Sequence, residues 1–238
     1  MAQLIIDIGN TRIKSALFEG RELLAEFSSE DLDLVLASWE KVDFRHCLVS
    51  SVRWSRPELE TKLPFNFLFL DSKTSLPVKN FYKSIHSLGL DRVAGAIGAW
   101  VLSERKAVLA VDLGTCITFD FINARSEYIG GAISPGLSLR AKSMHSLTAN
   151  LPLISLKSAP EYFTGATTEE CMKAGIWYGI NFEIEGQIKK YIQENPELEV
   201  FICGGDAQCF ESLAKDHIFV VPNLVLVGLN CILNHNVE

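Results

Sequence analysis

The spacing of apolar residues divides the chain into short strands and amphipathic helices. Short continuous or alternating apolar runs predict strands at 3–8, 12–18, 21–27, 45–52, 65–70, 75–79, 107–112, 116–122, 127–133 and 199–203. Apolar residues at three- and four-residue spacing predict helices at 30–40, 56–62, 90–104, from Pro135-Gly136 to about 146, 168–193, 206–214 and, after one more strand, from about 223. The stretch 152–164 is predicted to be a loop.

One unit of this pattern occurs twice along the chain. The apolar strand at 3–8 ends in DIGNT (7–11), and the strand at 107–112 ends in DLGT (112–115). Each turn combines an Asp, a Gly two residues later and small hydroxyl or amide residues, and two further predicted strands follow it. A repeated unit determines the architecture, so it is the strongest guide to the fold.

We therefore expect two related halves, residues 1–105 and 106–238, which meet at the polar segment 103–106. Each half begins with a three-stranded meander and continues with alternating helices and strands, which predicts an α/β fold of mixed sheets flanked by helices. This order of elements resembles the actin-like and sugar-kinase-like ATPases. The resemblance implies that both turns face a cleft between the halves and that the active site lies there.

Both turns have the composition of a phosphate-binding site. Glycine and small polar residues, as at 9–11, let backbone N–H groups point outward, and Lys14 would add positive charge. A carboxylate repels a triphosphate, so Asp7 fits beside one only if a divalent cation lies between them. A hairpin turn would explain one such motif. The repetition, with the glycine pair at 204–205 as a flat surface for adenine, favours a nucleotide cleft.

Composition and charge narrow the class of protein. The 238 residues are 48% hydrophobic and 21% charged, which is typical of a globular chain. A net charge of −7 without a basic cluster argues against nucleic acid and anionic membranes as partners. Since no signal peptide and no membrane-spanning run is recognisable, we expect a cytoplasmic protein. The six cysteines form no Cys-x-x-Cys pair, so we expect reduced cysteines and no zinc site.

The stretch LGLDRV (88–93), at the start of a predicted helix, has two interpretations. Asp91 could cap the helix, with Arg92 on its solvated face. Alternatively, Asp91 binds an acceptor hydroxyl group while Arg92 binds an anionic group of the substrate. The residue types alone leave both interpretations open.

Five motifs together decide between them, because their order and spacing resemble those of type III pantothenate kinases. They are DIGNTRIK (7–14), GLDR (89–92), DLGTCITFD (112–120), GGAISPG (130–136) and CGGD (203–206). The resemblance covers nearly the whole chain, and the second and fourth motifs are more specific than the phosphate turns. It implies ATP-dependent phosphorylation of pantothenate to 4′-phosphopantothenate, the first step of coenzyme A biosynthesis.

The resemblance also implies roles for individual residues. ATP would be bound by Thr115 and by the whole first turn, that is Asp7, Ile8, Gly9, Asn10, Thr11, Arg12, Ile13 and Lys14. Asp91 would accept the proton, and Asp112 would bind a monovalent cation, K⁺ or NH₄⁺, in addition to the Mg²⁺ that accompanies ATP. Pantothenate would be bound by Tyr82, Gly89, Leu90, Asp91, Arg92 and Thr168, with the adjacent Thr167 as the alternative to Thr168.

The predicted helix 168–193 indicates a homodimer. It carries more apolar residues than one side needs for its own domain, namely Met172, Ile176, Trp177, Ile180, Ile184 and Ile188. A two-fold interface would repeat this helix face on both chains. The resemblance places the Thr at the start of this helix on pantothenate across the dimer interface, so Thr168 would complete the partner's site.

The chain departs from the family pattern at three positions. Ile85 replaces the usual Pro, Cys116 the usual Ala, and Cys203 the usual Thr. Two functions rival pantothenate phosphorylation. A related kinase with another hydroxyl substrate would have no reason to combine GLDR with Tyr82, and a nucleotide-binding regulator without kinase activity would have no need of Asp91.

Overall fold

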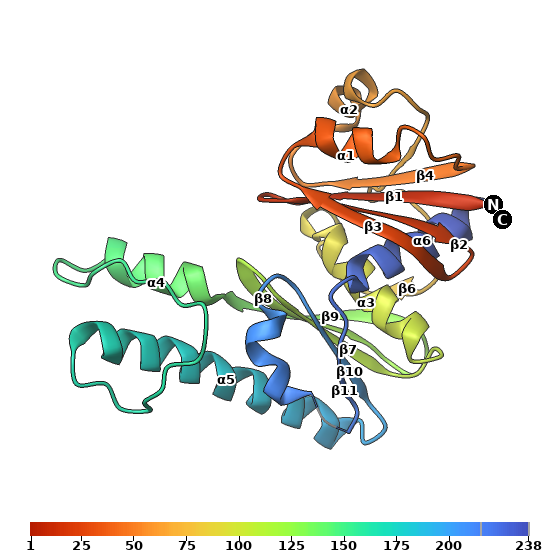
Figure 1. Cartoon of the computed structure of the whole chain (residues 1–238). Coiled ribbons are helices and arrows are strands. Elements are labelled where there is room, and N and C mark those ends of the chain that lie inside the picture. The colour runs from red at the N-terminus through yellow and green to blue at the C-terminus, as the bar shows by residue number, and fades with distance from the viewer. Residues whose placement is uncertain (215, 238) are drawn as a thin grey trace.

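The computed structural model describes residues 1–214 and 216–237, and it contains two sheets with helices between and outside them (Figure 1). Helices α1 (Leu32–Trp39) and α2 (Arg56–Lys62) cover the outer side of the first sheet, and α5 (Thr168–Glu194) covers the outer side of the second. Helices α3 (Leu90–Leu102) and α6 (Leu224–Val237) lie between the sheets. The predicted α/β class with mixed sheets is confirmed.

The first sheet has the strand order β3-β2-β1-β4-β5. Its strands are β1 (Ala2–Ile8), β2 (Ile13–Glu19), β3 (Glu22–Ser29), β4 (His46–Ser51) and β5 (Leu68–Phe69). The central strand β1 pairs antiparallel with β2 and parallel with β4. Both of its faces are buried, by residues such as Ile5 on one side and Ile6 on the other, which explains its continuous apolar run.

The second sheet has the order β11-β10-β7-β8-β9-β6. Its strands are β6 (Lys79–Asn80), β7 (Val108–Leu113), β8 (Cys116–Ile122), β9 (Glu127–Pro135), β10 (Glu199–Cys203) and β11 (Ile218–Val220). As in the first sheet, the strand that carries the turn Asp, β7, pairs antiparallel with the next strand and parallel with a later one. The two halves thus repeat the same arrangement around Asp7 and Asp112.

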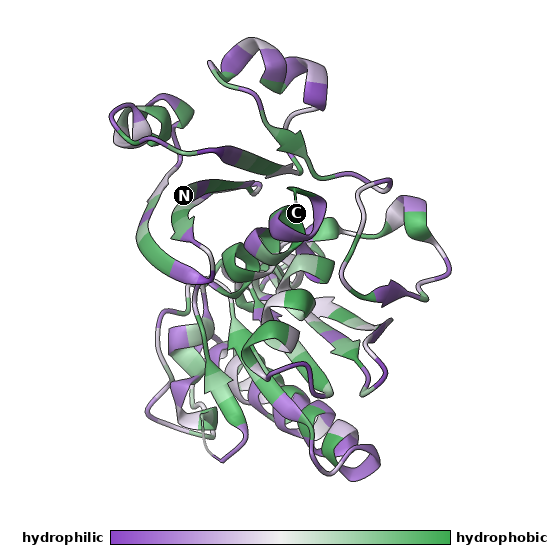
Figure 2. Cartoon of the chain, turned by 90° about the vertical axis from the view of Figure 1, so that its right-hand side faces the viewer, coloured by the Kyte–Doolittle hydropathy of each residue, from purple (hydrophilic) through white to green (hydrophobic). Residues whose placement is uncertain are grey.

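Close packing of α3 against α6 joins the two sheets. A side chain at Gly228 would lie 1.7 Å from the carbonyl oxygen of Ala94, and one at Gly98 would lie 2.2 Å from that of Leu224. The two glycines therefore let the helix backbones approach. Apolar residues are concentrated in the sheets and in these two helices (Figure 2).

Several elements cross between the sheets. The boundary expected at 105/106 separates the two meanders, but β6 and α3 precede it and contact the second sheet, whereas α6 follows it and contacts the first. The C-terminal helix α6 therefore packs against the sheet formed by the N-terminal strands. Among the described residues, no helix is both long and apolar enough to cross a membrane.

Most predicted elements are present, with local corrections. The strand predicted at 65–70 is reduced to β5, and the one predicted at 75–79 is the two-residue β6. The stretch predicted as a helix at 206–214 is the 3₁₀ helix η2 (Ala207–Leu213), and a second 3₁₀ helix, η1 (Ile85–Ser87), precedes α3. Helix α4 (Leu137–Ser146) and the first turns of α5 extend away from the two sheets (Figure 1).

Candidate active site

A pocket of about 320 Å³ lies where the first turn, the second turn and the start of α3 meet. Six of the residues singled out from the sequence for ATP, cation or substrate binding line it, namely Asn10, Thr11, Asp91, Arg92, Asp112 and Thr115. Gly114, Cys116 and Cys203, from the second turn and the late glycine motif, line it as well. Segments from four distant parts of the chain thus converge on one cavity.

The first turn follows directly from the pairing of β1 with its neighbours. Asp7 lies opposite Lys14 on β2 and opposite Ser50 on β4, and the Gly9 N–H donates to the carbonyl oxygen of Arg12 at 3.1 Å. Ile8 and Ile13 are fully buried, so their side chains anchor the turn in the core. Burial in the fold and repulsion from Asp91 raise the pKa of Asp7 to about 6, although Ser50 and Lys14 lower it.

The second turn is closed by two glycine motifs. The Gly136 N–H donates to the carbonyl oxygen of Thr115 at 3.0 Å, and a side chain at Gly136 would lie 2.2 Å from the Gly114 carbonyl oxygen. Gly204 has a φ of 99° and faces Asp112, whose Oδ1 would lie 2.6 Å from any Cβ added there. Both positions require glycine, which explains why GGAISPG and CGGD accompany the second turn.

Asp112 lies on β7 beside a buried thiol. The Cys203 thiol is 3.6 Å from Asp112 Oδ2, to which it donates a hydrogen bond. Burial raises the pKa of Asp112, whereas Lys14 and this hydrogen bond lower it. Asp112 contributes to the raised pKa of Asp7, and repulsion from Asp91 and Asp120 adds to the effect of burial in raising the pKa of Asp112. A cation bound between or beside these carboxylates would relieve this repulsion.

Asp91 and Arg92, the two charged residues of the acceptor motif GLDR (89–92), have different environments. Gly89 occupies the N-cap position of α3, so Asp91 lies in the first turn rather than at the cap. Its side chain is exposed towards the pocket, and its Oδ1 accepts a hydrogen bond from the Arg92 N–H at 2.9 Å. The Arg92 side chain is only 10% exposed. The interpretation that places Arg92 on a solvated helix face is therefore wrong.

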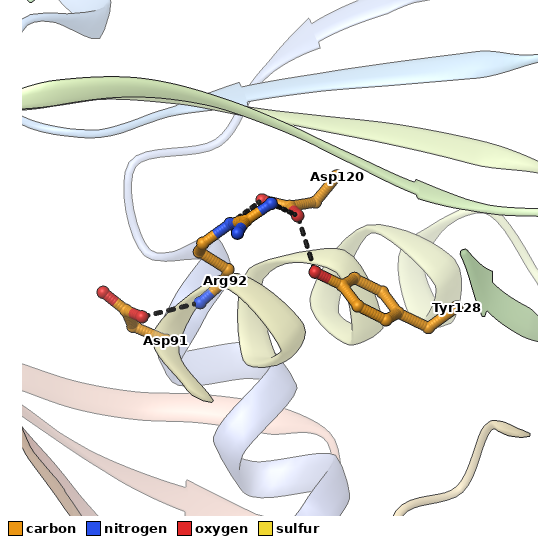
Figure 3. A network of polar contacts seen from close by, with 4 residues as sticks. All are labelled: Asp91, Arg92, Asp120 and Tyr128. Carbon is orange, nitrogen blue, oxygen red and sulfur yellow. Dashed lines mark hydrogen bonds and ion pairs between the residues drawn. The ribbon is translucent and has the colours of Figure 1, made fainter. Parts of the chain in front are cut away.

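A buried network holds the Arg92 guanidinium in one orientation (Figure 3). Its Nε and Nη2 donate to the two carboxylate oxygens of Asp120, at 3.2 and 2.7 Å, and the Tyr128 hydroxyl donates to Asp120 Oδ1 at 2.7 Å. The Tyr82 ring lies beside the guanidinium, with its centroid 5.8 Å away. Such a forked ion pair, 1% exposed at Asp120, is geometrically specific.

Sequence reasoning assigned no role to Asp120 or Tyr128, although Asp120 ends the quoted motif DLGTCITFD. Cys116, Thr118 and Asp120 alternate along β8, and all three line the pocket. Alternate residues of a strand face the same side. The alternation of residues along β8 was the sequence signal that could have placed Asp120 in the site. Tyr128 lies on β9, so only the pairing of the two strands brings it to Asp120.

Thr168 lies outside the pocket. It is the first residue of α5 and is exposed, at the end of the helix that extends away from the sheets (Figure 1). The neighbouring Thr167 is the N-cap residue, and its hydroxyl accepts a hydrogen bond from the Glu170 N–H at 3.2 Å. Because Thr167 caps the helix, Thr168 has the freer hydroxyl of the two.

The apolar residues predicted to form a dimer face on α5 are buried within the chain. Six residues suggested an unpartnered face, but all are at most 5% exposed within the chain's own core, namely Met172, Ile176, Trp177, Ile180, Ile184 and Ile188. The second sheet and its neighbouring helices cover them. Phe163 and Phe182 are exposed instead, at 65% and 56%, and their rings contact Tyr178.

Comparison with solved structures agrees with this fold. A Campylobacter jejuni protein assigned to the Baf family of transcriptional activators superposes with a TM-score of 0.65 at 22% identity, and the match covers 98% of both chains. The activator of 2-hydroxyisocaproyl-CoA dehydratase from Clostridium difficile, with bound ADPNP, has a TM-score of 0.55 at 13% identity, covering 99% and 94%. A Listeria monocytogenes protein assigned as an N-acetylmannosamine kinase has a TM-score of 0.53 at 14% identity, covering both chains entirely. The expected likeness to sugar-kinase-like ATPases is confirmed.

Comparison of sequences is more specific. The family model described as type III pantothenate kinase matches residues 3–190. Type III pantothenate kinases from Bacteroides fragilis and Cytophaga hutchinsonii are 42% and 38% identical, and each match covers 98% of this chain and 98% or 99% of the relative. With its acceptor motif, its two turns and both glycine motifs assembled around one pocket, this chain belongs to the type III pantothenate kinase family.

Proposed function

We propose that this chain transfers the γ-phosphoryl group of ATP to the primary hydroxyl of pantothenate, as the first step of coenzyme A biosynthesis. The observation that carries this proposal is the convergence of both phosphate turns with Asp91 and Arg92 on one pocket. In phosphoryl transfer, alignment and charge neutralisation supply most of the catalysis. A pocket that joins phosphate cradles to an acceptor motif serves both purposes.

In this proposal the first turn binds the ATP phosphates. The backbone N–H groups of Asn10 and Thr11 and the ammonium group of Lys14 would face the phosphate oxygens, with Thr115 contacting ATP from the opposite turn. Mg²⁺ bound with the nucleotide would neutralise phosphate charge, and Asp7 would hold it, directly or through water. Burial and the nearby Asp91 disfavour the ionised form of Asp7, and a bound cation would offset that effect.

Asp112 would hold K⁺ or NH₄⁺ on the other side of the pocket. Its burial and its proximity to other carboxylates support a bound positive charge. Within the described residues, no group of three or more His, Cys, Asp and Glu side chains lies close enough together to hold a metal ion. Activity measured in different monovalent salts at constant Mg²⁺ tests the proposed site at Asp112.

Asp91 would orient the pantothenate hydroxyl and accept its proton late in the transfer. Arg92, fixed by Asp120, would face the pantothenate carboxylate with the donors that the ion pair leaves available. Tyr82, beside that guanidinium, and the backbone of Gly89 and Leu90 would complete the substrate site.

The function is tested by ADP release. In potassium buffer with Mg²⁺ and ATP, we expect ADP release to depend on pantothenate, with 4′-phosphopantothenate formed in equal amount. A coupled spectrophotometric assay and mass spectrometry of the product would measure both. If ADP release does not depend on pantothenate but is stimulated by another alcohol, the chain is a kinase with a different substrate. ATP binding without any turnover would favour the nucleotide-binding regulator.

We further propose a cytoplasmic homodimer without nucleic acid or membrane partners, in which Thr168 completes the site of the other chain. The exposed start of α5, remote from its own pocket, and the exposed aromatic residues Phe163 and Phe182 support this assignment. A two-fold axis would place the same patch on both subunits. Each active site would then combine Asp91 of one chain with Thr168 of the other.

Mixing two inactive variants tests the shared site. Asp91→Asn and Thr168→Arg are unfolded together and refolded, so that half of the dimers are mixed and each mixed dimer regains one of its two sites. Roughly a quarter of wild-type activity should return. Each variant refolded alone is the control. No recovery from a mixture shown by native mass spectrometry to contain mixed dimers would contradict the shared site.

A further inference from the structure

Arg53 lies directly behind the first phosphate turn. Strands β1 and β4 run parallel, with Ile8 opposite Ser51, so both end at the same edge of the sheet. The Val52 N–H continues the pairing by donating to the Ile8 carbonyl oxygen at 3.0 Å. The Ser51 hydroxyl then accepts from the Arg53 and Trp54 N–H groups, at 3.2 and 2.9 Å, and this turns the chain beside the DIGNT segment.

The Arg53 guanidinium binds the turn through its backbone. Its Nη2 donates to the carbonyl oxygens of Gly9 and Asn10, at 2.9 and 3.1 Å. In a trans peptide the C=O and the following N–H point in opposite directions. The N–H groups of Asn10 and Thr11 therefore point away from Arg53, and both residues line the pocket on the other side.

The guanidinium packs against an aromatic ring, and the turn itself is closed by a hydrogen bond. It lies over the indole ring of Trp54, 5.2 Å from the ring centroid, and the Lys62 ammonium group lies 5.3 Å from the same ring. Within the turn, the Gly9 N–H is already bonded to the Arg12 carbonyl oxygen. The turn is thus bonded at both ends, and the two N–H groups between them are oriented towards the pocket.

We propose that Arg53 is a positioning residue for ATP, which it never touches. By holding two carbonyl groups on the far side of the turn, it presents the Asn10 and Thr11 N–H groups to the nucleotide phosphates before ATP arrives. Preorganised donors bind without first being reoriented. This inference rests on the proposed role of the first turn in ATP binding.

The test is a comparison of Michaelis constants in Arg53→Met. We expect KM for ATP to rise about tenfold, with kcat and KM for pantothenate within about twofold of wild type, because a lost ground-state binding contribution raises KM alone. Arg56→Met is the matched control, since Arg56 lies three residues further on and pairs with the exposed Glu60. This control should leave all three constants unchanged.

A second readout separates positioning from simple attraction between Arg53 and phosphate. In nucleotide-free protein, hydrogen–deuterium exchange of a peptide covering 7–14 should be faster in Arg53→Met, because the Gly9–Arg12 hydrogen bond opens once the turn is released. An unchanged exchange rate, or an equal rise in KM for both substrates, would overturn the inference. If Arg53→Met fails to fold, Arg53→Gln, which is polar but too short to reach the carbonyl groups, serves for both measurements.

Lys14→Met distinguishes failure of this inference from failure of the ATP-binding role. If Lys14→Met raises KM for ATP and Arg53→Met does not, the first turn binds phosphate but Arg53 does not position it. If neither variant changes KM for ATP, the phosphate role of the turn is itself wrong, and the positioning role falls with it.

Discussion

Replacement of Asp91 by Asn should lower turnover about 10²–10⁴-fold, the range for loss of a general base. Asparagine keeps the size of the side chain and can still accept the hydrogen bond that Asp91 receives from the Arg92 N–H, but it cannot take the hydroxyl proton. Pantothenate binding, measured by calorimetry, should change much less. The rate of ADP release in saturating substrates measures the effect on turnover.

Asp33→Asn is the matched control for this variant. Asp33 occupies the first turn of α1, as Asp91 does in α3, but it lies on the outer side of the first sheet. A helix-terminal carboxylate contributes a small stabilisation through the helix dipole in either position. If Asp91→Asn keeps more than half of wild-type turnover, as Asp33→Asn should, Asp91 serves only its helix and the proposed mechanism is wrong.

Removal of the monovalent cation should have a comparably large effect. At constant ionic strength and constant Mg²⁺, activity in K⁺ or NH₄⁺ should fall about 10²-fold or more in Na⁺ or tetramethylammonium, because several kcal/mol of charge stabilisation are lost. Asp112→Ala should be nearly inactive in every salt. Initial rates of ADP release across the four salts measure both effects.

One outcome of the comparison of salts would contradict the cation role of Asp112. Equal wild-type rates in all four salts would remove the monovalent cation from Asp112 and leave that carboxylate as a turn residue or a magnesium ligand. Thermal unfolding of Asp112→Ala is the control for folding. Asp112 packs against Gly204 and the Cys203 thiol, so loss of its side chain also removes local contacts.

Local sequence was sufficient for the repeated framework. The strand-turn units at Asp7 and Asp112 could be predicted because an apolar run, an Asp, a Gly and small polar residues are short-range signals, and both units form with the same strand pairing. The acceptor motif at 89–92 was also visible, and α3 begins within it. Short elements such as β5 and β6 were predicted too long, since two paired residues leave almost no periodicity to detect.

Other features depended on packing between distant segments. Arg92 was expected at the substrate, but its partner Asp120 is 28 residues away and Tyr128 comes from a different strand. The apolar residues of α5 were assigned to a dimer interface, whereas the second sheet buries them within the chain. Periodicity shows that a helix face is apolar, and it does not identify the surface that covers the face.

The sequence by itself determined the two strand-turn units and the acceptor motif, because turn, cap and motif signals lie within a few consecutive residues. Only the tertiary structure decided how those residues are held, with Asp120 fixing Arg92, Arg53 behind the first turn and Thr168 outside the pocket of its own chain. The physical reason is that hydrogen bonds and ion pairs act over a few ångströms in space. Strand order and helix packing bring such partners together, and sequence separation contains little information about them.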